Sequence, residues 1–317
     1  MLHYRTFRNT DPPVLSELWR SRRGQLGLYQ PASPSLLEQL VFAKLYFDYE
    51  GLVLAFDGDR AVGFAHAGFG PNEAEDEVST ELGTTCLVLV RPDCDEARVA
   101  AGLLEQCEGY LRRRGAKVLY GGAIHPLDPF YLGLYGGSEL PGVLESDLPA
   151  NEAFRSRGYQ EIDQVMVLRR ELAGFHPPMD RRQMQARRQM IVEEITDPPA
   201  RSWWEACTLG EFHLTRFDLT PRDGGRPVAR ATFRSLEAAG TAGISRAAGL
   251  IELFVDESLR RRGLAIFLVS EAFRQFMRQG LSLVEAQCMS HNEAARGVYE
   301  KLGFHPADTG AVFRKEA

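Results

Sequence analysis

The six residues "RRRGLA" (260–265) lie between an apolar run, "LIELFV" (250–255), and a long amphipathic segment. The run predicts a β-strand that ends at Val255, and the segment after Gly263 predicts an α-helix. The first turn of a helix offers unpaired backbone N–H groups and the positive end of the helix dipole, and both favour anions. A glycine lets a phosphate approach the backbone, and arginines add charge-assisted contacts. The junction is therefore a candidate phosphate site, although a basic cluster before a helix is also typical of a solvated surface.

A second motif begins at Asn292, in "NEAARGVYEKLGF" (292–304). The combined pattern, R-x-x-G-x-A followed by N-x-x-A-x-x-x-Y-x-K-x-G-F, resembles the GNAT superfamily of N-acetyltransferases from Ile251 to Phe304. The resemblance implies an acyl-coenzyme A donor, with acetyl-CoA as co-substrate, and a point where neighbouring strands splay apart. The donor-binding residues that it implies are Leu253, Phe254 and Val255 for the pantetheine, Arg260, Arg261, Arg262, Gly263, Leu264 and Ala265 for the pyrophosphate, and Asn292, Ala295 and Tyr299 near the pantetheine and the sulfur.

Acetyl transfer needs a neutral amine, a polarised thioester and a proton for the leaving thiolate. Tyr299 is the candidate general acid and Glu252 the candidate general base, acting directly or through water. A backbone N–H near Val255 is the candidate oxyanion donor. Glu285 and His291 are alternative bases, and each side chain also has a purely structural interpretation, such as a core position for Tyr299. No nucleophile triad is recognisable, so we expect direct transfer in a ternary complex.

The first half of the chain repeats the order of the second. Its apolar run "TCLVLV" (85–90) corresponds to 250–255, and Gly58 corresponds to Gly224 in the turns of two predicted hairpins. These matches indicate an internal duplication.

The first copy reverses the charge of the candidate site. Acids crowd the helix start at 93–96, where they suit the helix dipole but repel a pyrophosphate. Phe154 stands opposite Tyr299, and Asp147 stands opposite Asn292. We therefore expect the first copy to lack the donor site and to satisfy its helix start with its own carboxylates.

We predict an α/β (α+β layered) fold of two tandem GNAT-like domains, each a mixed, mostly antiparallel twisted sheet flanked by helices. The predicted divisions are a degenerate domain at 1–172 with an insertion near 126–149, a basic linker at 173–188, and an acyl-CoA-binding catalytic domain at 189–317. The linker is either a solvated connector or an added helix. The insertion is rich in Gly and Pro but also aromatic, so we expect it to be buried. It packs either on its own domain, over the vacated groove, or at the acceptor entrance of the second.

The composition limits the partners. The 317 residues are 44% hydrophobic and 25% charged, and 37 basic against 43 acidic residues give a net charge of −6. Such a chain is not expected to bind nucleic acid. The GNAT resemblance implies a small-molecule or peptide amine as the acceptor. The five cysteines are scattered, which favours a reducing compartment and no metal site. The sequence has no apolar span and no signal-peptide core, so we expect a cytoplasmic protein that contacts no membrane. We expect it to be a monomer or a homodimer.

The expected function is N-acyltransfer from acetyl-CoA to an amine in the C-terminal domain. Two alternatives remain open at this stage. A non-catalytic acyl-CoA-binding or regulatory protein is opposed by the intact Arg260, Gly263, Asn292 and Tyr299. A tandem aminoacyl transferase that uses tRNA is opposed by the acidic net charge and by the intact coenzyme A motif.

Overall fold

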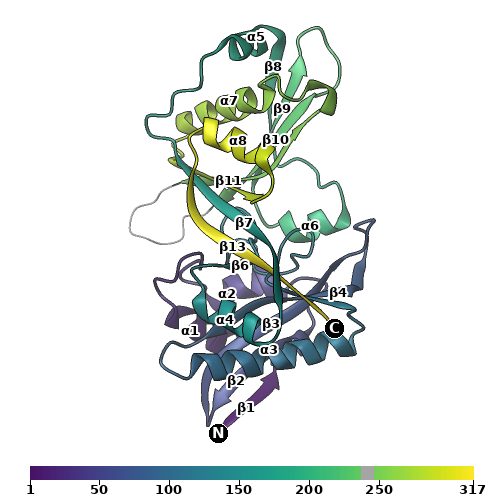
Figure 1. Cartoon of the computed structure of the whole chain (residues 1–317), viewed down its shortest axis with the longest axis vertical. Helices are drawn as coiled ribbons and strands as arrows, with labels where there is room; N and C mark the ends of the chain where they lie inside the picture. Colours follow the sequence, from purple (N-terminus) through teal and green to yellow (C-terminus); the bar gives the residue numbers. More distant parts are fainter. Residues whose placement is uncertain (237–245) are drawn as a thin grey trace. The chain divides into compact units, whose positions relative to one another are not determined.

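The computed structural model describes residues 1–236 and 246–317, which form two compact units (Figure 1). Unit 1 comprises Met1–Val165, Ala200–Glu211 and Asp308–Ala317, and unit 2 comprises Met166–Pro199 and Phe212–Ala307. The units are therefore interleaved along the chain. The divisions at 1–172, 173–188 and 189–317 describe the repeated order of elements along the sequence, and they remain a prediction.

Unit 1 contains a mixed sheet with the strand order β1-β2-β3-β4-β5-β13, and β6 also pairs with β13. Its neighbours run antiparallel except β4 and β5, which run parallel. The strands are β1 (Leu2–Thr6), β2 (Leu52–Asp57), β3 (Arg60–Pro71), β4 (Val78–Val90), β5 (Val118–Gly121), β6 (Val143–Leu144) and β13 (His305–Glu316). The helices are α1 (Pro12–Ser21), α2 (Pro34–Leu37), a π-helical turn (Glu38–Phe42), a 3-10 turn (Tyr49–Gly51), α3 (Glu96–Arg113), α4 (Leu148–Ser156) and α6 (Trp203–Leu209).

Unit 2 contains the strand order β12-β11-β10-β9-β8, in which β11 and β12 are the parallel pair. The strands are β8 (Met190–Thr196), β9 (Leu214–Pro221), β10 (Ala229–Leu236), β11 (Ala247–Val255) and β12 (Leu283–Met289). The helices are α5 (Arg181–Gln189), a 3-10 turn (Glu257–Leu259), α7 (Leu264–Arg278) and α8 (Glu293–Lys301). The α/β class and the mostly antiparallel sheets flanked by helices are confirmed.

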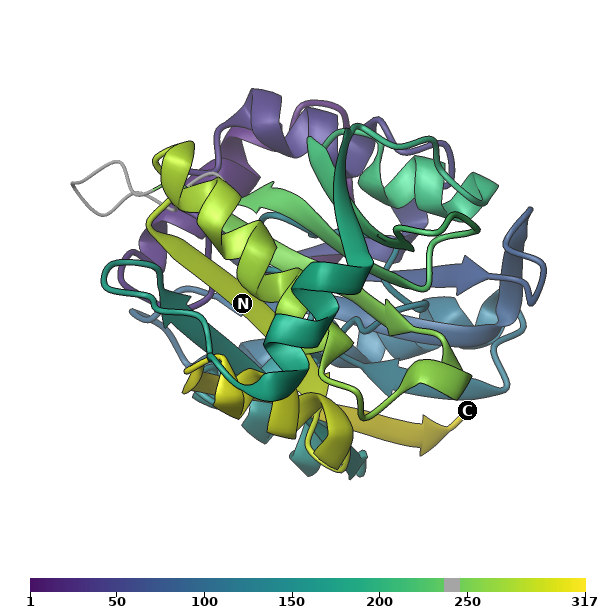
Figure 2. The same ribbon diagram turned by 90° about the horizontal axis from the view of Figure 1, so that it is seen from above.

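One long helix covers the sheet in each unit. Helix α3 packs on β2, β3 and β4, and α7 packs on β9, β10 and β11 (Figure 2 shows α7 in yellow-green). The buried face of α7 includes Leu268, Ala272 and Phe276, whose spacing of four residues keeps them on one side of the helix. The hydrophobic core of unit 2 therefore lies directly beneath the helix that begins at Gly263.

The last strand of each repeat has residues in both units. Strand β7 (Gln160–Glu171) leaves unit 1 after Val165, and β13 enters unit 1 at Asp308. Within unit 1, Phe313 of β13 pairs with Gly121 of β5. The final strand of the second copy thus completes the sheet that contains the first copy.

Two predicted local features agree with the structure, and one open alternative is resolved. The hairpins form around Gly58 and Gly224, which have φ angles of 60° and 98°. The basic segment between the repeats contains the helix α5 rather than only a solvated connector.

Candidate functional site

Strands β11 and β12 separate at their carboxyl ends. Their pairing ends at Leu250 and Ala286, although β11 continues to Val255, which still pairs with Ala229 of β10 on its other side. A β-bulge at Ile251 lies where the separation begins. Within the described part of the chain, no strand pairs with this free edge of β11. The expected splay is confirmed, and it leaves backbone groups open to an extended ligand.

The loop from β11 into α7 contains two left-handed residues. Arg261 has a φ of 63° and Gly263 a φ of 84°. Glycine adopts this conformation without strain, whereas a left-handed non-glycine residue costs about 1–2 kcal/mol. Left-handed residues turn successive backbone N–H groups to one side and create a concave anion site. The loop therefore holds Arg261 in a left-handed backbone conformation that a non-glycine residue disfavours.

The start of α7 is uncapped. Gly263 is the N-cap residue, and it has no side chain to accept a hydrogen bond from the first turn. Arg260, Arg261 and Arg262 are all exposed beside it, and Arg260 Nε donates to the carbonyl oxygen of Val255 at 3.2 Å. Unpaired N–H groups next to three guanidinium groups fit a pyrophosphate, so the residues at this position suit a coenzyme A donor.

The α8 residues predicted for the site have clear structural roles. Asn292 caps α8, since its Oδ1 accepts from the N–H of Ala295 at 3.1 Å. Tyr299 is 5% exposed, and its ring packs on Phe304 with centroids 5.2 Å apart. Ala295 packs against the same core. Their contacts with a donor remain predictions.

The candidate bases differ in their surroundings. Glu252 lies on the open part of β11, where its Oε2 accepts from Thr232 Oγ1 at 2.8 Å. Glu285 lies on the paired part of β12, is 2% exposed, and forms an ion pair with Arg169 at 2.9 Å. His291 is exposed ahead of α8. Since Glu285 lies where β11 and β12 are paired and Glu252 lies beyond that pairing, Glu252 is the better placed of the two carboxylates.

The equivalent helix start in unit 1 is satisfied by acids. Asp95 is the N-cap of α3, and its side chain accepts from the N–H of Arg98 at 3.2 Å. Asp93 accepts hydrogen bonds from Arg60 and Arg91, which lower the pKa of its carboxyl group. This arrangement confirms that the first copy uses its own carboxylates where the second copy has arginines.

The strand opening in unit 1 is closed. The pairing of β4 with β5 also ends early, at Thr85 and Gly121, while β4 continues to Val90. The side chains at 87–90 are nevertheless all buried, with exposures of 2–6%, whereas Phe254 at the matching part of β11 is 48% exposed. The two copies therefore share a strand opening, and only the one in unit 2 is accessible.

The aromatic insertion near 126–149 is buried in the same unit. Its apolar residues are all buried within unit 1: Phe130, Tyr131, Leu132, Leu134 and Tyr135. The Phe130 ring stacks on His66 at 4.2 Å, and the Tyr131 hydroxyl hydrogen-bonds to His66 Nδ1 at 3.0 Å. Burial lowers the pKa of His66 to about 3, so this imidazole is neutral. The expected burial is confirmed as packing on the insertion's own unit.

Two residues that contact the loop at 256–263, the candidate donor loop, were missed by the sequence analysis. Gln183 Nε2 donates to the carbonyl oxygen of Gly263 at 3.2 Å, and Arg182 Nη1 donates to that of Arg261 at 3.2 Å. Both come from α5. The sequence indicated only a basic segment there, and nothing in its pattern pointed to the loop.

Two features are absent from the residues that the structure describes. No group of three or more His, Cys, Asp or Glu side chains is arranged to hold a metal ion. No helix in residues 1–236 and 246–317 combines the length and the apolar character needed to cross a membrane.

Comparison with known proteins agrees with this geometry. Residues 182–304 match the model of the acetyltransferase (GNAT) family. No curated protein has a significant sequence match to the chain.

Several solved structures share the fold. A GCN5-related glucosamine N-acetyltransferase region of a fungal multi-domain GH3 beta-N-acetylglucosaminidase aligns at a TM-score of 0.71 and 16% identity, over 99% of this chain and 38% of that one. A tandem GNAT protein from the clavulanic acid biosynthesis pathway aligns at 0.67 and 15% identity, over 100% and 98%. A GCN5-related N-acetyltransferase from Sphaerobacter thermophilus aligns at 0.61 and 17%, over 99% and 95%. This chain thus spans well under half of the fungal protein, and at these identities the likeness concerns the fold. Residues 182–304 thus resemble the GNAT family, and the chain as a whole shares its fold with a tandem GNAT protein.

Proposed function

We propose that unit 2 transfers an acetyl or related acyl group from coenzyme A to an amine acceptor. One observation carries this proposal: the open edge of β11 ends at Val255, and the loop that follows leads to the uncapped N-terminus of α7 at Gly263. An extended amide chain and a pyrophosphate are the two parts that such a pair of features suits, and coenzyme A contains both.

Each part of the donor has a matching group. The pantetheine amides would pair with the backbone of residues 253–255, on the edge that β12 leaves free. The pyrophosphate would accept hydrogen bonds from the first N–H groups of α7 and ion pairs from Arg260 and Arg262. The family resemblance assigns Asn292 and Tyr299 to the thioester end.

The reaction that we propose is direct. The donor supplies a thioester, whose carbonyl carbon forms a bond with the amine nitrogen and then loses the thiolate. A backbone N–H near Val255 stabilises the oxyanion of the tetrahedral intermediate. Glu252, oriented by Thr232, takes the proton from the amine directly or through water. Tyr299 gives its phenolic proton to the thiolate.

Unit 1 has a structural part in this proposal. The residues along its strand opening are buried, and its α3 start is capped by an acid, so we expect no second donor site there. We propose a small-molecule or peptide amine as the acceptor. Glucosamine is a reasonable first compound because the fungal structure with the same fold is described as a glucosamine N-acetyltransferase region.

The test is an acceptor screen with acetyl-CoA. Purified protein is incubated with glucosamine, other amino sugars, polyamines and lysine-containing peptides, and both thiol release and acetylated product are measured. The proposal expects amine-dependent thiol release that the double variant Arg260→Ala/Arg262→Ala strongly reduces. Tight coenzyme A binding without transfer to any amine would instead support a non-catalytic acyl-CoA-binding protein.

A further inference from the structure

Helix α5 lies beside the start of α7 (Figure 2) and holds the two left-handed residues of the donor loop. Gln183 is 7% exposed, and its side-chain amide donates to the carbonyl oxygen of Gly263. Arg182, one residue earlier, donates to the carbonyl oxygen of Arg261. Neighbouring side chains of one helix thus bind alternate carbonyl groups of one loop.

These contacts fix the direction of the loop's N–H groups. In a planar trans peptide, the carbonyl oxygen of one residue and the N–H of the next point in opposite directions. Carbonyl groups of Arg261 and Gly263 that face α5 therefore turn the N–H groups of Arg262 and Leu264 away from α5. These N–H groups belong to the concave surface that receives an anion.

The contact with Gly263 is close. A Cβ atom on Gly263 would lie 3.0 Å from Gln183 Nε2 and 3.3 Å from Arg182 Cβ. Glycine thus suits the left-handed φ, and an added Cβ would also displace its α5 neighbours by a few tenths of an ångström.

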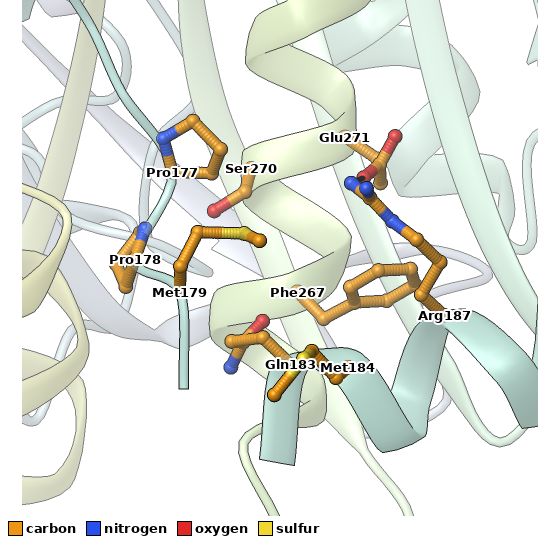
Figure 3. Close-up of a pocket in the computed structure, with 9 residues that line it drawn as sticks. All are labelled: Pro177, Pro178, Met179, Gln183, Met184, Arg187, Phe267, Ser270 and Glu271. Carbon is orange, nitrogen blue, oxygen red and sulfur yellow. Dashed lines mark hydrogen bonds and ion pairs between the residues drawn. The ribbon is translucent and has the colours of Figure 1, made fainter. Parts of the chain in front are cut away.

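Other contacts hold α5 on α7 independently of the loop. Arg187 forms an ion pair with Glu271 at 2.9 Å, and Met184 lines a shared pocket with Phe267 (Figure 3). Asp180 caps α5 by accepting from the N–H of Gln183 at 2.9 Å. These contacts fix the position of α5 on α7 without the loop. The helix can therefore act as a support for the strained loop.

We propose that Gln183 and Arg182 are positioning residues of the donor site, which hold the loop in its anion-binding conformation and so set the affinity for the nucleotide part of the donor. This inference rests on the proposed function. It extends the donor site to an element outside the loop and outside the motif that identifies the loop. Gln183 is uncharged, so its contribution is separable from simple attraction between arginine and phosphate.

The experiment compares coenzyme A with pantetheine, which lacks the nucleotide and its pyrophosphate. Dissociation constants are measured by calorimetry or competition for the full chain and for Gln183→Leu, Arg182→Ala and Arg182→Lys. Gln185→Leu is the matched control, because Gln185 lies on the same helix and its side-chain amide bonds to Gln189 of α5. We expect Gln183→Leu and Arg182→Ala to weaken coenzyme A binding about tenfold each, the effect of one hydrogen bond of ordinary strength, and to leave pantetheine unchanged. Arg182→Lys, which still donates, should retain most of the affinity, and Gln185→Leu all of it.

The opposite results are distinct. Equal weakening of both ligands, or no change for coenzyme A, overturns the positioning role while the proposed function stands. If Gln183→Leu does not fold, the Arg182→Ala and Arg182→Lys pair decides by the same comparison. Absence of coenzyme A binding by the unaltered chain contradicts the proposed function, and this inference with it.

Discussion

The Nε atom of Arg22 donates a hydrogen bond to the carbonyl oxygen of Val90, 2.6 Å away, at the end of strand β4. The matching carbonyl group of unit 2, on Val255, bonds to Arg260. Arg22 comes from the end of α1 and is also paired with Glu96, whereas Arg260 is an exposed residue of the donor loop. In unit 1 the arginine at the strand end is thus held by an ion pair within the unit. In unit 2 the arginine at the equivalent strand end is exposed.

The first prediction concerns charge at the donor loop. Arg260→Ala and Arg262→Ala should each weaken coenzyme A binding about tenfold, since exposed charge-assisted contacts are worth roughly 1–2 kcal/mol. The effect should shrink at high salt because these side chains are exposed. Calorimetry at two ionic strengths checks both points. Arg113→Ala is the control, because it lies in a similar "RRRG" sequence that ends α3 rather than starting a helix. Equal losses in the control would mean that net charge alone matters.

The second prediction separates two roles of one glycine. Gly263→Ala should lower stability by about 1–2 kcal/mol through left-handed strain and should also weaken donor binding, because its Cβ meets Gln183 and Arg182. Gly280→Ala is the matched control, with a φ of 80° and nothing within 4 Å of the added Cβ. It should lose similar stability and keep full affinity. The measurements are chemical denaturation and coenzyme A titration, and unchanged affinity in Gly263→Ala would argue against the loop geometry.

The third prediction concerns turnover. Tyr299→Phe should lower kcat about a hundredfold with little change in donor affinity, since a proton given in the transition state is not a binding contact. The ring is kept, so its packing on Phe304 survives. Steady-state kinetics with a saturating acceptor and a separate binding measurement make the comparison. An unchanged kcat, with chemistry rate-limiting, would leave Tyr299 as a core residue only.

The fourth prediction concerns Asp147, the residue of unit 1 that corresponds to Asn292. Burial raises the pKa of Asp147 from its ordinary 3.8 to about 6. The native state therefore holds this proton more tightly than the unfolded state does, so Asp147 favours folding at low pH. That contribution is lost as the pH rises from about 4 to about 6.

Asp147→Asn, which introduces the residue type found at 292, removes this dependence. The stability of the variant relative to the unaltered protein should rise between pH 4 and pH 7, by at most about 3 kcal/mol. Denaturant unfolding across that range checks the prediction. A difference that does not vary with pH would show that Asp147 has the same pKa in the native and unfolded states.

Sequence reasoning reached the parts of the site that are local. The end of β11, the three arginines and Gly263 all lie within residues 255–263. Over so short a segment, the spacing in the sequence sets much of the geometry. The acid-capped helix start of unit 1 was foreseen for the same reason, because acids at 93–96 act on the helix start that immediately follows.

The parts that were missed depend on packing between distant segments. Gln183 is 80 residues from Gly263, and a polar residue on a basic helix gives no sign of which carbonyl it will meet. Similarly, α6 belongs to unit 1, where Trp204 is buried and donates to Asp128 at 3.2 Å. The passage of β7 and β13 between the units was also missed, since strand alternation shows which face is buried and not which sheet is joined.

The central claim is that the chain has one donor site and that it lies in unit 2. Titration calorimetry of the full chain with coenzyme A measures the number of sites directly. The account predicts one site per chain, whose affinity falls strongly in the Arg260→Ala/Arg262→Ala double variant. Two sites of similar affinity, or a single site that the double variant leaves unchanged, would contradict it.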